Sequence, residues 1–323
     1  MTHVLVSGAN GFVGQVLGRA LVDAGHSVTG LVRHAGGCAD GVREWVHHGK
    51  DFTGVADVWP QGLKPDCVVH LAARVHVMND DAADPDAAFR ETNVEGTLRL
   101  AGAAWQNGVR RFVFVSSIKA VAESDGGRPV REDDAVHVED AYGRSKRDAE
   151  QALIRYGDET GLDVVIVRPP LVYGPRVRAN FLRLMDGIWR GVPLPLGAVS
   201  ARRSLIYVGN LADALVRCTD DPRAAHQCFH VADSDDPTVS ELARTIGRHL
   251  QKTARLFPVP VGVLRLAGQL VRRSAHVERL IGSLQVDTTH IRRVLDWNPP
   301  YSADDGLAAT ARWYRSMRGY GST

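Results

Sequence analysis

The hydrophobic positions of the chain change period from one segment to the next. Short apolar runs typical of buried strands occur at 3–7, 27–32, 66–71, 111–116 and 163–167. Between them, apolar residues recur every three or four positions, which predicts helices at 15–24, 87–107 and 142–160. Strands that alternate with helices in this way predict an α/β fold, a Rossmann-type doubly wound parallel sheet.

Beyond residue 168 the pattern loosens into proline- and glycine-rich connections, with helical patterns at 180–190, 239–250 and 261–272. Residues 204–231 contain a strand, an apolar helix and a second strand, so we expect them to return to the sheet. The predicted domains are therefore 1–170 plus about 203–233, and a smaller, discontinuous one of about 171–202 plus 234–323. The polar segments 80–86 and 122–140 are expected to be mobile loops, and the second is a candidate gate.

Composition narrows the class of protein. The chain has 323 residues, 44% hydrophobic and 24% charged, with a formal net charge of +2, which is ordinary for a globular protein and gives no reason to expect nucleic acid as a partner. No apolar stretch approaches the roughly 20 residues that span a bilayer, and the N-terminus lacks a secretory pattern. We expect a cytoplasmic protein with no membrane insertion.

Cysteine and histidine spacing bears on metal and redox chemistry. The four cysteines have no CxxC spacing, so we expect reduced thiols. The thirteen histidines form neither an HExxH motif nor a Cys/His cluster. The sequence therefore predicts no metal site.

A glycine motif, Gly8-Ala-Asn-Gly11-Phe12-Val13-Gly14, joins the first predicted strand to the first predicted helix. Backbone N–H groups and a helix N-terminus in such a turn can hold a pyrophosphate that a Cβ atom would push away. Glycine-rich turns also occur for packing reasons alone. The position between strand and helix favours a dinucleotide site that includes all three glycines, with Phe12 and Val13 beside them.

The residue after the second strand bears on which dinucleotide binds. An NAD site usually has Asp or Glu there, but this chain has Arg33, and a guanidinium can pair with a 2′-phosphate. The sequence therefore favours NADP(H) over NAD(H), the alternative being a solvated arginine over the adenine. Asp51 and Phe52 follow where a third strand would end beside the adenine, and Asp51 either accepts its amino group or caps a turn.

The fourth and fifth strands end in residues suited to a cofactor and a substrate. After His70, which we interpret as structural, Leu71, Ala72 and Ala73 allow the backbone to approach a flat cofactor. The next strand ends in two serines, at the carboxyl edge where open α/β sheets bind ligands. Ser116 is assigned to the cofactor. Ser117 can polarise a substrate oxygen, although serine pairs at strand ends are often only turn formers.

Tyr142 and Lys146 lie four residues apart on a predicted helix and therefore share one face. A nearby ammonium favours the phenolate, so we expect the tyrosine pKa to lie below its usual value of about 10. A phenol tuned in this way exchanges protons near neutrality. This spacing is common on ordinary helices, but together with the glycine motif and the serines it indicates a hydride-transfer enzyme.

Over nearly its whole length the chain resembles the extended short-chain dehydrogenase/reductase family of nucleotide-sugar epimerases, dehydratases and reductases. The resemblance implies that Ser117, Tyr142 and Lys146 are catalytic and that Asn93, in Asn-Val-Glu-Gly-Thr, positions the lysine or a relay water within the cofactor site. Tyr142 and Lys146 then also contact the cofactor. In related enzymes the helices at 87–107 and 142–160 pair with their copies, so a homodimer is expected.

Further family motifs imply a substrate site. Arg168-Pro169-Pro-Leu171-Val-Tyr-Gly-Pro is similar to a family motif that implies a cofactor contact at Pro169, with Leu171 in place of the usual asparagine. By the same resemblance Asn180 contacts a pyrophosphate and Arg203 a nucleotide phosphate. Arg279 and Asp287 are weaker candidates for nucleotide contacts, since helical arginines are usually just solvated.

Two segments, Ser-Ser-Ile-Lys and Arg-Arg-Ser-Leu-Ile-Tyr-Val-Gly-Asn-Leu, resemble the bacterial branch that reduces or epimerises C4 of UDP-N-acetylated 6-deoxyhexoses for surface polysaccharide. Dehydration is disfavoured because no carboxylate follows Ser117. We therefore expect NADPH-dependent reduction of a UDP-4-keto-6-deoxy-N-acetylhexosamine. The alternatives are a UDP-sugar 4-epimerase with retained NAD and a non-catalytic dinucleotide-binding sensor.

Overall fold

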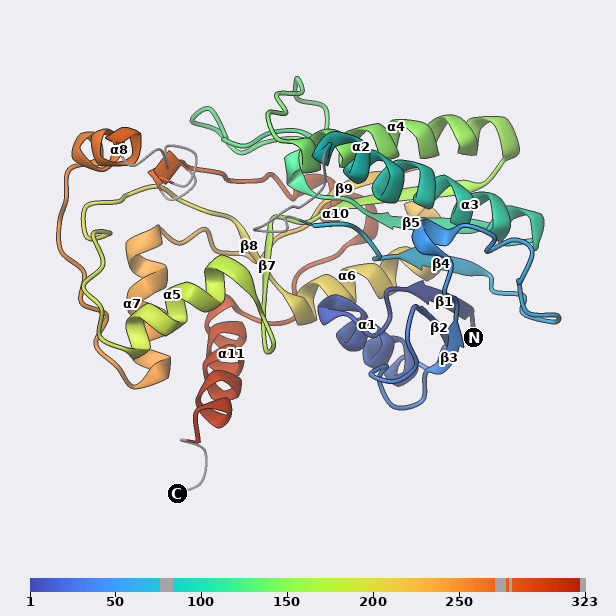
Figure 1. The fold of residues 1–323 in the computed structure, drawn as a ribbon, viewed down its shortest axis with the longest axis horizontal. Helices are drawn as coiled ribbons and strands as arrows, with labels where there is room; N and C mark the ends of the chain where they lie inside the picture. Colours follow the sequence, from blue (N-terminus) through green and yellow to red (C-terminus); the bar gives the residue numbers. More distant parts are fainter. Residues whose placement is uncertain (76–83, 271–276, 279–280, 320–323) are drawn as a thin grey trace.

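A seven-stranded parallel sheet forms the centre of the molecule (Figure 1). The computed structural model describes residues 1–75, 84–270, 277–278 and 281–319. The strand order is β3-β2-β1-β4-β5-β6-β9, and every neighbouring pair is parallel. The strands are β1 (His3–Ser7), β2 (Ser27–Val32), β3 (Arg43–Val46), β4 (Cys67–His70), β5 (Arg111–Val115), β6 (Asp163–Arg168) and β9 (Cys228–His230). The predicted doubly wound sheet is confirmed.

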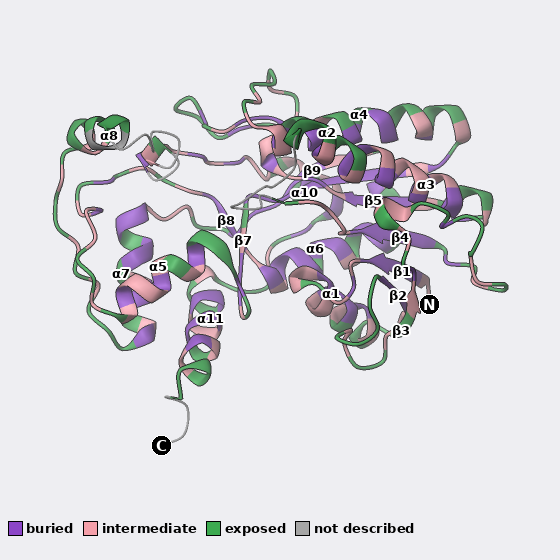
Figure 2. Ribbon diagram, viewed as in Figure 1, coloured by how far each residue is buried: buried purple, intermediate pink, exposed green. Residues whose placement is uncertain are grey.

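Helices cover both faces of this sheet. The helices α1 (Phe12–Asp23) and α6 (Val208–Asp220) pack together on one face, and α3 (Gly96–Gln106) and α4 (Ala141–Thr160) on the other. Each layer buries its own apolar core, with Leu17 and Leu211 in the first and Leu100 and Leu153 in the second. The strands between the layers are accordingly buried, whereas the outer helix faces are exposed (Figure 2).

The helix predicted at 87–107 is three elements in succession. They are α2 (Pro85–Arg90), a π-helical turn η2 (Glu91–Glu95) and α3. Such π turns frequently mark functional sites. This one places Asn93, which is almost fully buried, on the side that faces α4.

A second group of helices lies beside one end of the sheet (Figure 1). It contains α5 (Ala179–Trp189), α7 (Val239–Leu250) and α11 (Ala303–Met317), which share a core that includes Met185, Ile246 and Ala311. The helix α8 (Val261–Leu270) stands at its outer edge, and α10 (Thr289–Leu295) packs instead on the α1/α6 layer.

The expectation that residues 204–231 return to the sheet holds in part. α6 covers the sheet and β9 pairs with β6, but the first strand of the segment, β8 (Leu205–Tyr207), pairs with β7 (Leu171–Tyr173) in a separate two-stranded sheet. Apolar residues alone do not specify which edge a short strand joins, so the pattern could not distinguish these pairings.

The segment 122–140 has fixed partners in the structure. The Val130 main chain exchanges hydrogen bonds with Gln285 and Asp287, at 2.8 Å each, and the Asp125 carboxylate accepts from Ser283 and Gln285. These bonds anchor a segment that its polarity led us to expect as a mobile gate. Of the other predicted loop, 80–86, only residues 84–86 are described, and Asp84 caps the start of α2.

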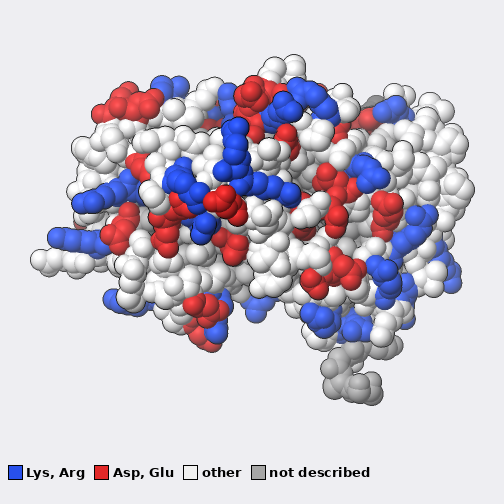
Figure 3. Space-filling model, turned by 180° about the vertical axis from the view of Figure 1, so that it is seen from behind, with Lys and Arg blue, Asp and Glu red and all other residues white. Residues whose placement is uncertain are grey.

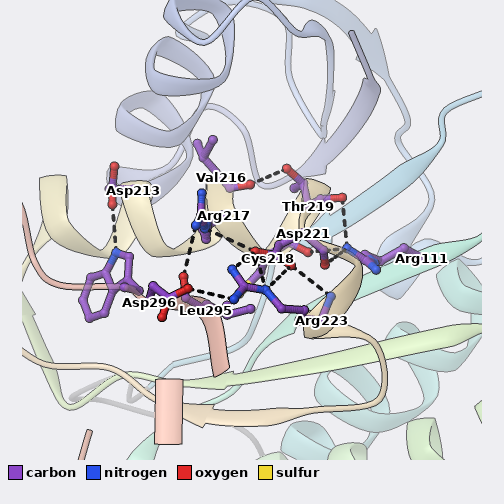
Figure 4. Close-up of polar contacts among 11 residues, drawn as sticks. Arg111, Asp213, Val216, Arg217, Cys218, Thr219, Asp221, Arg223, Leu295 and Asp296 are labelled. Atoms are coloured by element: carbon purple, nitrogen blue, oxygen red, sulfur yellow. Dashed lines mark hydrogen bonds and ion pairs between the residues drawn. The ribbon is translucent and has the colours of Figure 1, made fainter. Parts of the chain in front are cut away.

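A network of arginines lies at the end of the sheet where β5 and β6 begin (Figure 4). The Arg111 guanidinium donates to the carbonyls of Cys218, Thr219 and Asp221 at the end of α6, and it pairs with Asp163. Cations are favourable at a helix C-terminus. Asp221 in turn pairs with Arg217 and Arg223, and these bonds lower the pKa of Asp221 to about 2.

Acidic and basic side chains are interspersed over the face shown in Figure 3, in keeping with the small net charge. Among the described helices, none is both long and apolar enough to cross a membrane.

Candidate active site

The glycine turn folds back on itself between β1 and α1. Gly8 has a φ of +70°, and a Cβ atom there would lie 3.2 Å from the Ala72 nitrogen. A Cβ at Gly14 would lie 2.2 Å from the Gly8 carbonyl oxygen, and Gly11 donates to that oxygen at 2.9 Å. The glycines are therefore needed for packing of the turn, and the dinucleotide interpretation of the motif stays a prediction.

The N-terminus of α1 is suited to an anion. Its N-cap is Gly11, so no side chain caps the helix, and no acidic residue occupies the first turn. The free N–H groups and the helix dipole favour a phosphate. Phe12 contacts the α5/α7/α11 core and Val13 the α1/α6 core, and the contact of both residues with a dinucleotide stays a prediction.

The region expected beside the adenine contains strained backbone. Asp51 and Phe52 have φ values of +49° and +59°, which is unusual for residues other than glycine and frequent at functional sites. They lie in the short turn η1 (Lys50–Phe52), and the Phe52 ring centroid is 5.5 Å from that of His70. Arg33 is exposed directly after β2.

A buried chain of hydrogen bonds joins the ends of β1 and β4 to η2. Ser7 Oγ lies 2.6 Å from His70 Nδ1, and His70 Nε2 lies 3.0 Å from Thr97 Oγ1. Because Thr97 donates its hydroxyl proton to the Asn93 carbonyl, it accepts from His70, which must therefore carry its proton on Nε2. Burial lowers the pKa of His70 to about 3, so the ring stays neutral. Its predicted structural role is supported.

The same set of hydrogen bonds fixes the residues after β4 that we expected to contact the cofactor. Leu71 and Ala72 donate from their main-chain nitrogens to Ser7 Oγ, at 3.2 and 3.3 Å, and Ala73 follows them, half-buried. The main chain past β4 is therefore held close to the glycine turn.

Asn93 connects this network to α4. Its side-chain oxygen accepts from the Arg74 nitrogen at 2.8 Å, and its side-chain nitrogen donates to the Arg74 carbonyl at 3.0 Å and to Ser145 Oγ at 2.9 Å. Ser145 donates to the Tyr142 carbonyl. Asn93 thus holds the chain after β4 against the start of α4, which makes it a positioning residue in this structure.

The three predicted catalytic residues lie just past β5 and on α4, and each has a contact near the end of the strand. Ser117 and Tyr142 are joined by a hydrogen bond between their side chains. Lys146 is 2% exposed, and its Nζ donates to the Val115 carbonyl at 2.9 Å and lies 4.6 Å from the Phe114 ring centroid. Asp140 caps α4 by accepting from the Gly143 nitrogen at 2.7 Å, and its carboxylate pairs with Lys119.

Burial governs the protonation of this group. It raises the pKa of Tyr142 to about 12, and Asp140 adds to this effect while the bond with Ser117 opposes it. Burial also lowers the pKa of Lys146 to about 8, opposed by Glu150. The expectation that the tyrosine pKa lies below 10 is wrong for this structure, because removal of the phenol from water outweighs the favourable contacts.

The side chain of Ser116 lies away from the expected cofactor contact. Its Oγ donates to Glu150 Oε1 at 2.5 Å, and Glu150 also binds the Arg168 guanidinium through both oxygens. Glu150 is fully buried and Arg168 is 4% exposed. Sequence analysis named Arg168 only as part of a family motif and missed Glu150, for which the available signal was its spacing, four residues after Lys146.

The predicted substrate contacts are more dispersed. Asn180 is exposed in the first turn of α5, and Arg203 is half-buried, with burial lowering its pKa and Asp125 opposing this. The Pro169 carbonyl accepts from the Ile118 nitrogen at 3.0 Å. Arg279 lies outside the described residues. Asp287 bonds to the Thr289 nitrogen at the start of α10 and pairs with Arg131 at 3.3 Å.

Comparison with known sequences identifies the family. Residues 4–232 match the profile of the NAD dependent epimerase/dehydratase family. The chain belongs to this family. Within it, the chain is 40% identical over 312 residues to a Vibrio cholerae protein named UDP-glucose 4-epimerase, a match that covers 96% of this chain and 94% of the relative.

A second relative comes from Escherichia coli O157:H7 and is 26% identical to this chain. The match covers 96% of this chain and 95% of the relative. It is named N-acetyl-alpha-D-glucosaminyl-diphospho-ditrans,octacis-undecaprenol 4-epimerase. Among solved structures, UDP-glucose 4-epimerase of Thermotoga maritima with UDP-glucose has a TM-score of 0.79 at 22% identity, covering 98% and 99% of the two chains.

UDP-glucuronic acid 4-epimerase of Bacillus cereus, in complex with NAD, has a TM-score of 0.79 at 19% identity and covers 99% of both chains. At these identities the structural matches show the fold.

Proposed function

We propose that this protein moves a hydride at C4 of a UDP-sugar and that it is a UDP-sugar 4-epimerase with a retained NAD. The proposal is supported by the hydrogen bond between Ser117 and Tyr142 and by the bond that holds the Lys146 ammonium at the carboxyl end of β5. In an open parallel sheet this edge also holds the glycine turn, so a dinucleotide there reaches the three side chains. The name of the Vibrio cholerae relative supports 4-epimerisation over other reactions.

Each residue has a distinct task. Tyr142 takes the proton from the sugar O4 and later returns it, and Ser117 holds O4 by a hydrogen bond. Lys146 binds the nicotinamide ribose and supplies positive charge. NAD, when bound beside these residues, would supply the reversible hydride transfer at C4.

The residues present fit a dinucleotide. Gly8 and Gly14 have no room for a Cβ, and the uncapped α1 presents free N–H groups to a pyrophosphate. Tyr142, with its raised pKa, is protonated in this structure and becomes a base only when positive charge gathers beside it. Lys146, on the next turn of α4, is the chain's own source of that charge.

Arg33 favours a second candidate, NADPH-dependent 4-ketoreduction. The residue is exposed directly after β2, where a carboxylate would select against a 2′-phosphate. Under this alternative the substrate is a UDP-4-keto-6-deoxy-N-acetylhexosamine for surface polysaccharide, and NADP(H) exchanges in each cycle. The structures of Bacillus cereus and Thermus thermophilus epimerases in complex with NAD weigh toward the first candidate.

One experiment separates the candidates. The purified protein is denatured and the released dinucleotide is quantified. The native protein is then offered UDP-glucose, UDP-galactose and their N-acetylated forms without added cofactor, and a UDP-4-keto-6-deoxy-N-acetylhexosamine with NADPH. An epimerase releases stoichiometric NAD and interconverts a pair without added cofactor. A reductase consumes NADPH only with the 4-keto sugar. Bound dinucleotide with no turnover on any of these compounds would leave the non-catalytic sensor.

We also propose that the sugar binds between the sheet domain, 1–170 plus about 203–233, and the domain of α5, α7 and α11. A homodimer through α3 and α4 is a further proposal. It is supported by Trp105 and Ile154, which are 43% and 47% exposed on these helices. Light scattering tests it, and a monomeric mass would contradict it.

A further inference from the structure

Glu150 joins three elements at the base of the candidate site. It lies on α4, one helical turn beyond Lys146, and has no exposed surface. Ser116, just past β5, donates to Oε1 at 2.5 Å, and Arg168, at the end of β6, donates to Oε1 at 2.9 Å and to Oε2 at 2.7 Å. Arg147 adds a longer contact of 3.6 Å.

These bonds hold both neighbours of Ser117. Ser116 is fixed directly by Glu150. On the other side, the Ile118 nitrogen donates to the Pro169 carbonyl, and Pro169 follows Arg168, which Glu150 binds. Glu150 thus adds side-chain bonds from α4 to the main-chain bonds that hold both neighbours of Ser117.

The charge of Glu150 also acts on Lys146. The groups that act on the ammonium are the Val115 carbonyl, the Phe114 ring, the neutral His70 ring and, on the same helix, Glu150. The negative charge of Glu150 raises the pKa of Lys146 against the lowering effect of burial. Arg168 and Arg147, which are bound to Glu150, moderate this effect without abolishing it.

We propose that Glu150 is a positioning residue for the C4 reaction, which fixes Ser117 through Ser116 and Arg168 and keeps the neighbouring Lys146 charged. This inference rests on the proposed function. Stability alone is a weak reason for a buried carboxylate, because apolar replacements of buried ion pairs are often equally stable.

Glu150→Gln is the direct test, since glutamine keeps the size and the oxygen that accepts from Ser116 but loses the charge. We expect kcat to fall about 10- to 100-fold, since displacements of about 1 Å cost up to about 10²-fold. KM should change little. Lys146 should lose its proton at lower pH, so the alkaline limb of the kcat profile should move to lower pH.

Two matched variants assign the effects. Ser116→Ala removes the link to Ser117 but keeps the charge, so kcat should fall with the alkaline limb in place. Glu159→Gln makes the same chemical change at an exposed position of α4 and should leave both kcat and the profile unchanged.

Glu150→Gln leaves Arg168 buried without its partner, which is strongly destabilising in many proteins. If that variant does not fold, Glu150→Gln/Arg168→Gln, which removes both charges, should fold and show a smaller shift in the same direction. Wild-type kcat and an unmoved alkaline limb in the folded variant would overturn the role of Glu150. The proposed function is judged separately: a wild type without turnover on any UDP-sugar overturns both, whereas an active wild type silenced by Tyr142→Phe upholds it.

Discussion

The Lys146 ammonium is joined to the Val115 carbonyl by a 2.9 Å hydrogen bond. This bond holds the Lys146 side chain at Val115, the last residue of β5, which precedes Ser117 by two positions. The position of the ammonium therefore does not depend on the Tyr142 side chain. An ammonium has three donors, so two remain for a ribose or a relay water. The bond therefore holds the end of β5 against α4.

Tyr142→Phe should reduce kcat by about 10²- to 10⁴-fold, because it removes the group that exchanges the O4 proton. Binding of the dinucleotide and of UDP should persist, measured by calorimetry. Tyr156→Phe makes the same change further along α4 and should leave kcat near the wild-type value. A Tyr142→Phe variant that keeps more than about a hundredth of the turnover would refute proton transfer by this phenol.

Lys146→Met should lower kcat and yet stabilise the fold at neutral pH, because burial of the ammonium is unfavourable. The folded pKa of about 8 lies below the usual 10.5, so between these values the unfolded chain binds the proton that the native state has lost. As pH rises from about 8 to 10.5, the free energy of unfolding of the wild type should therefore increase relative to that of Lys146→Met. Urea unfolding at several pH values measures the gap, and a constant gap would contradict the lowered pKa.

Gly14→Ala should abolish dinucleotide retention, because its Cβ would lie 2.2 Å from the Gly8 carbonyl oxygen. Gly262→Ala is the matched control, since a Cβ there meets nothing within 4 Å. Dinucleotide released on denaturation is the readout. Full retention in Gly14→Ala would show that the turn can open without loss of the site.

Acid should destabilise the fold through His70 and His230, whose pKa values burial lowers to about 3. Between about 3 and 6.5 the unfolded chain binds protons that the native state does not, so the free energy of unfolding falls as pH decreases from 6.5. His70→Gln should remove one proton from this dependence. Urea titrations between pH 7 and pH 4 measure the slope of the free energy of unfolding against pH. If His70→Gln leaves this slope unchanged, groups other than His70 cause the dependence.

Local patterns predicted most of the sheet and the helix that contains Tyr142 and Lys146. Alternation of apolar runs gave the strands, and the Tyr142/Lys146 spacing on a helix put both residues on one face because helix geometry alone dictates it. The glycine motif located the turn between β1 and α1 for the same reason, since its steric requirements are local.

Features set by distant partners could not be predicted. The side chain of Ser116 points to Glu150 because Arg168, from another strand, completes that buried site. A glutamate on a polar helix has the same spacing whether it is solvated or buried. The raised pKa of Tyr142 likewise depends on burial, which arises only when the elements pack.

The path of the hydride is the most direct test of the account. The protein is incubated with UDP-glucose that bears deuterium at C4, and the label in product and residual sugar is followed by NMR. We predict UDP-galactose that retains deuterium at C4, in the wild type but not in Tyr142→Phe. Conversion with loss of the deuterium to solvent, or equal conversion by Tyr142→Phe, would contradict hydride transfer governed by this residue.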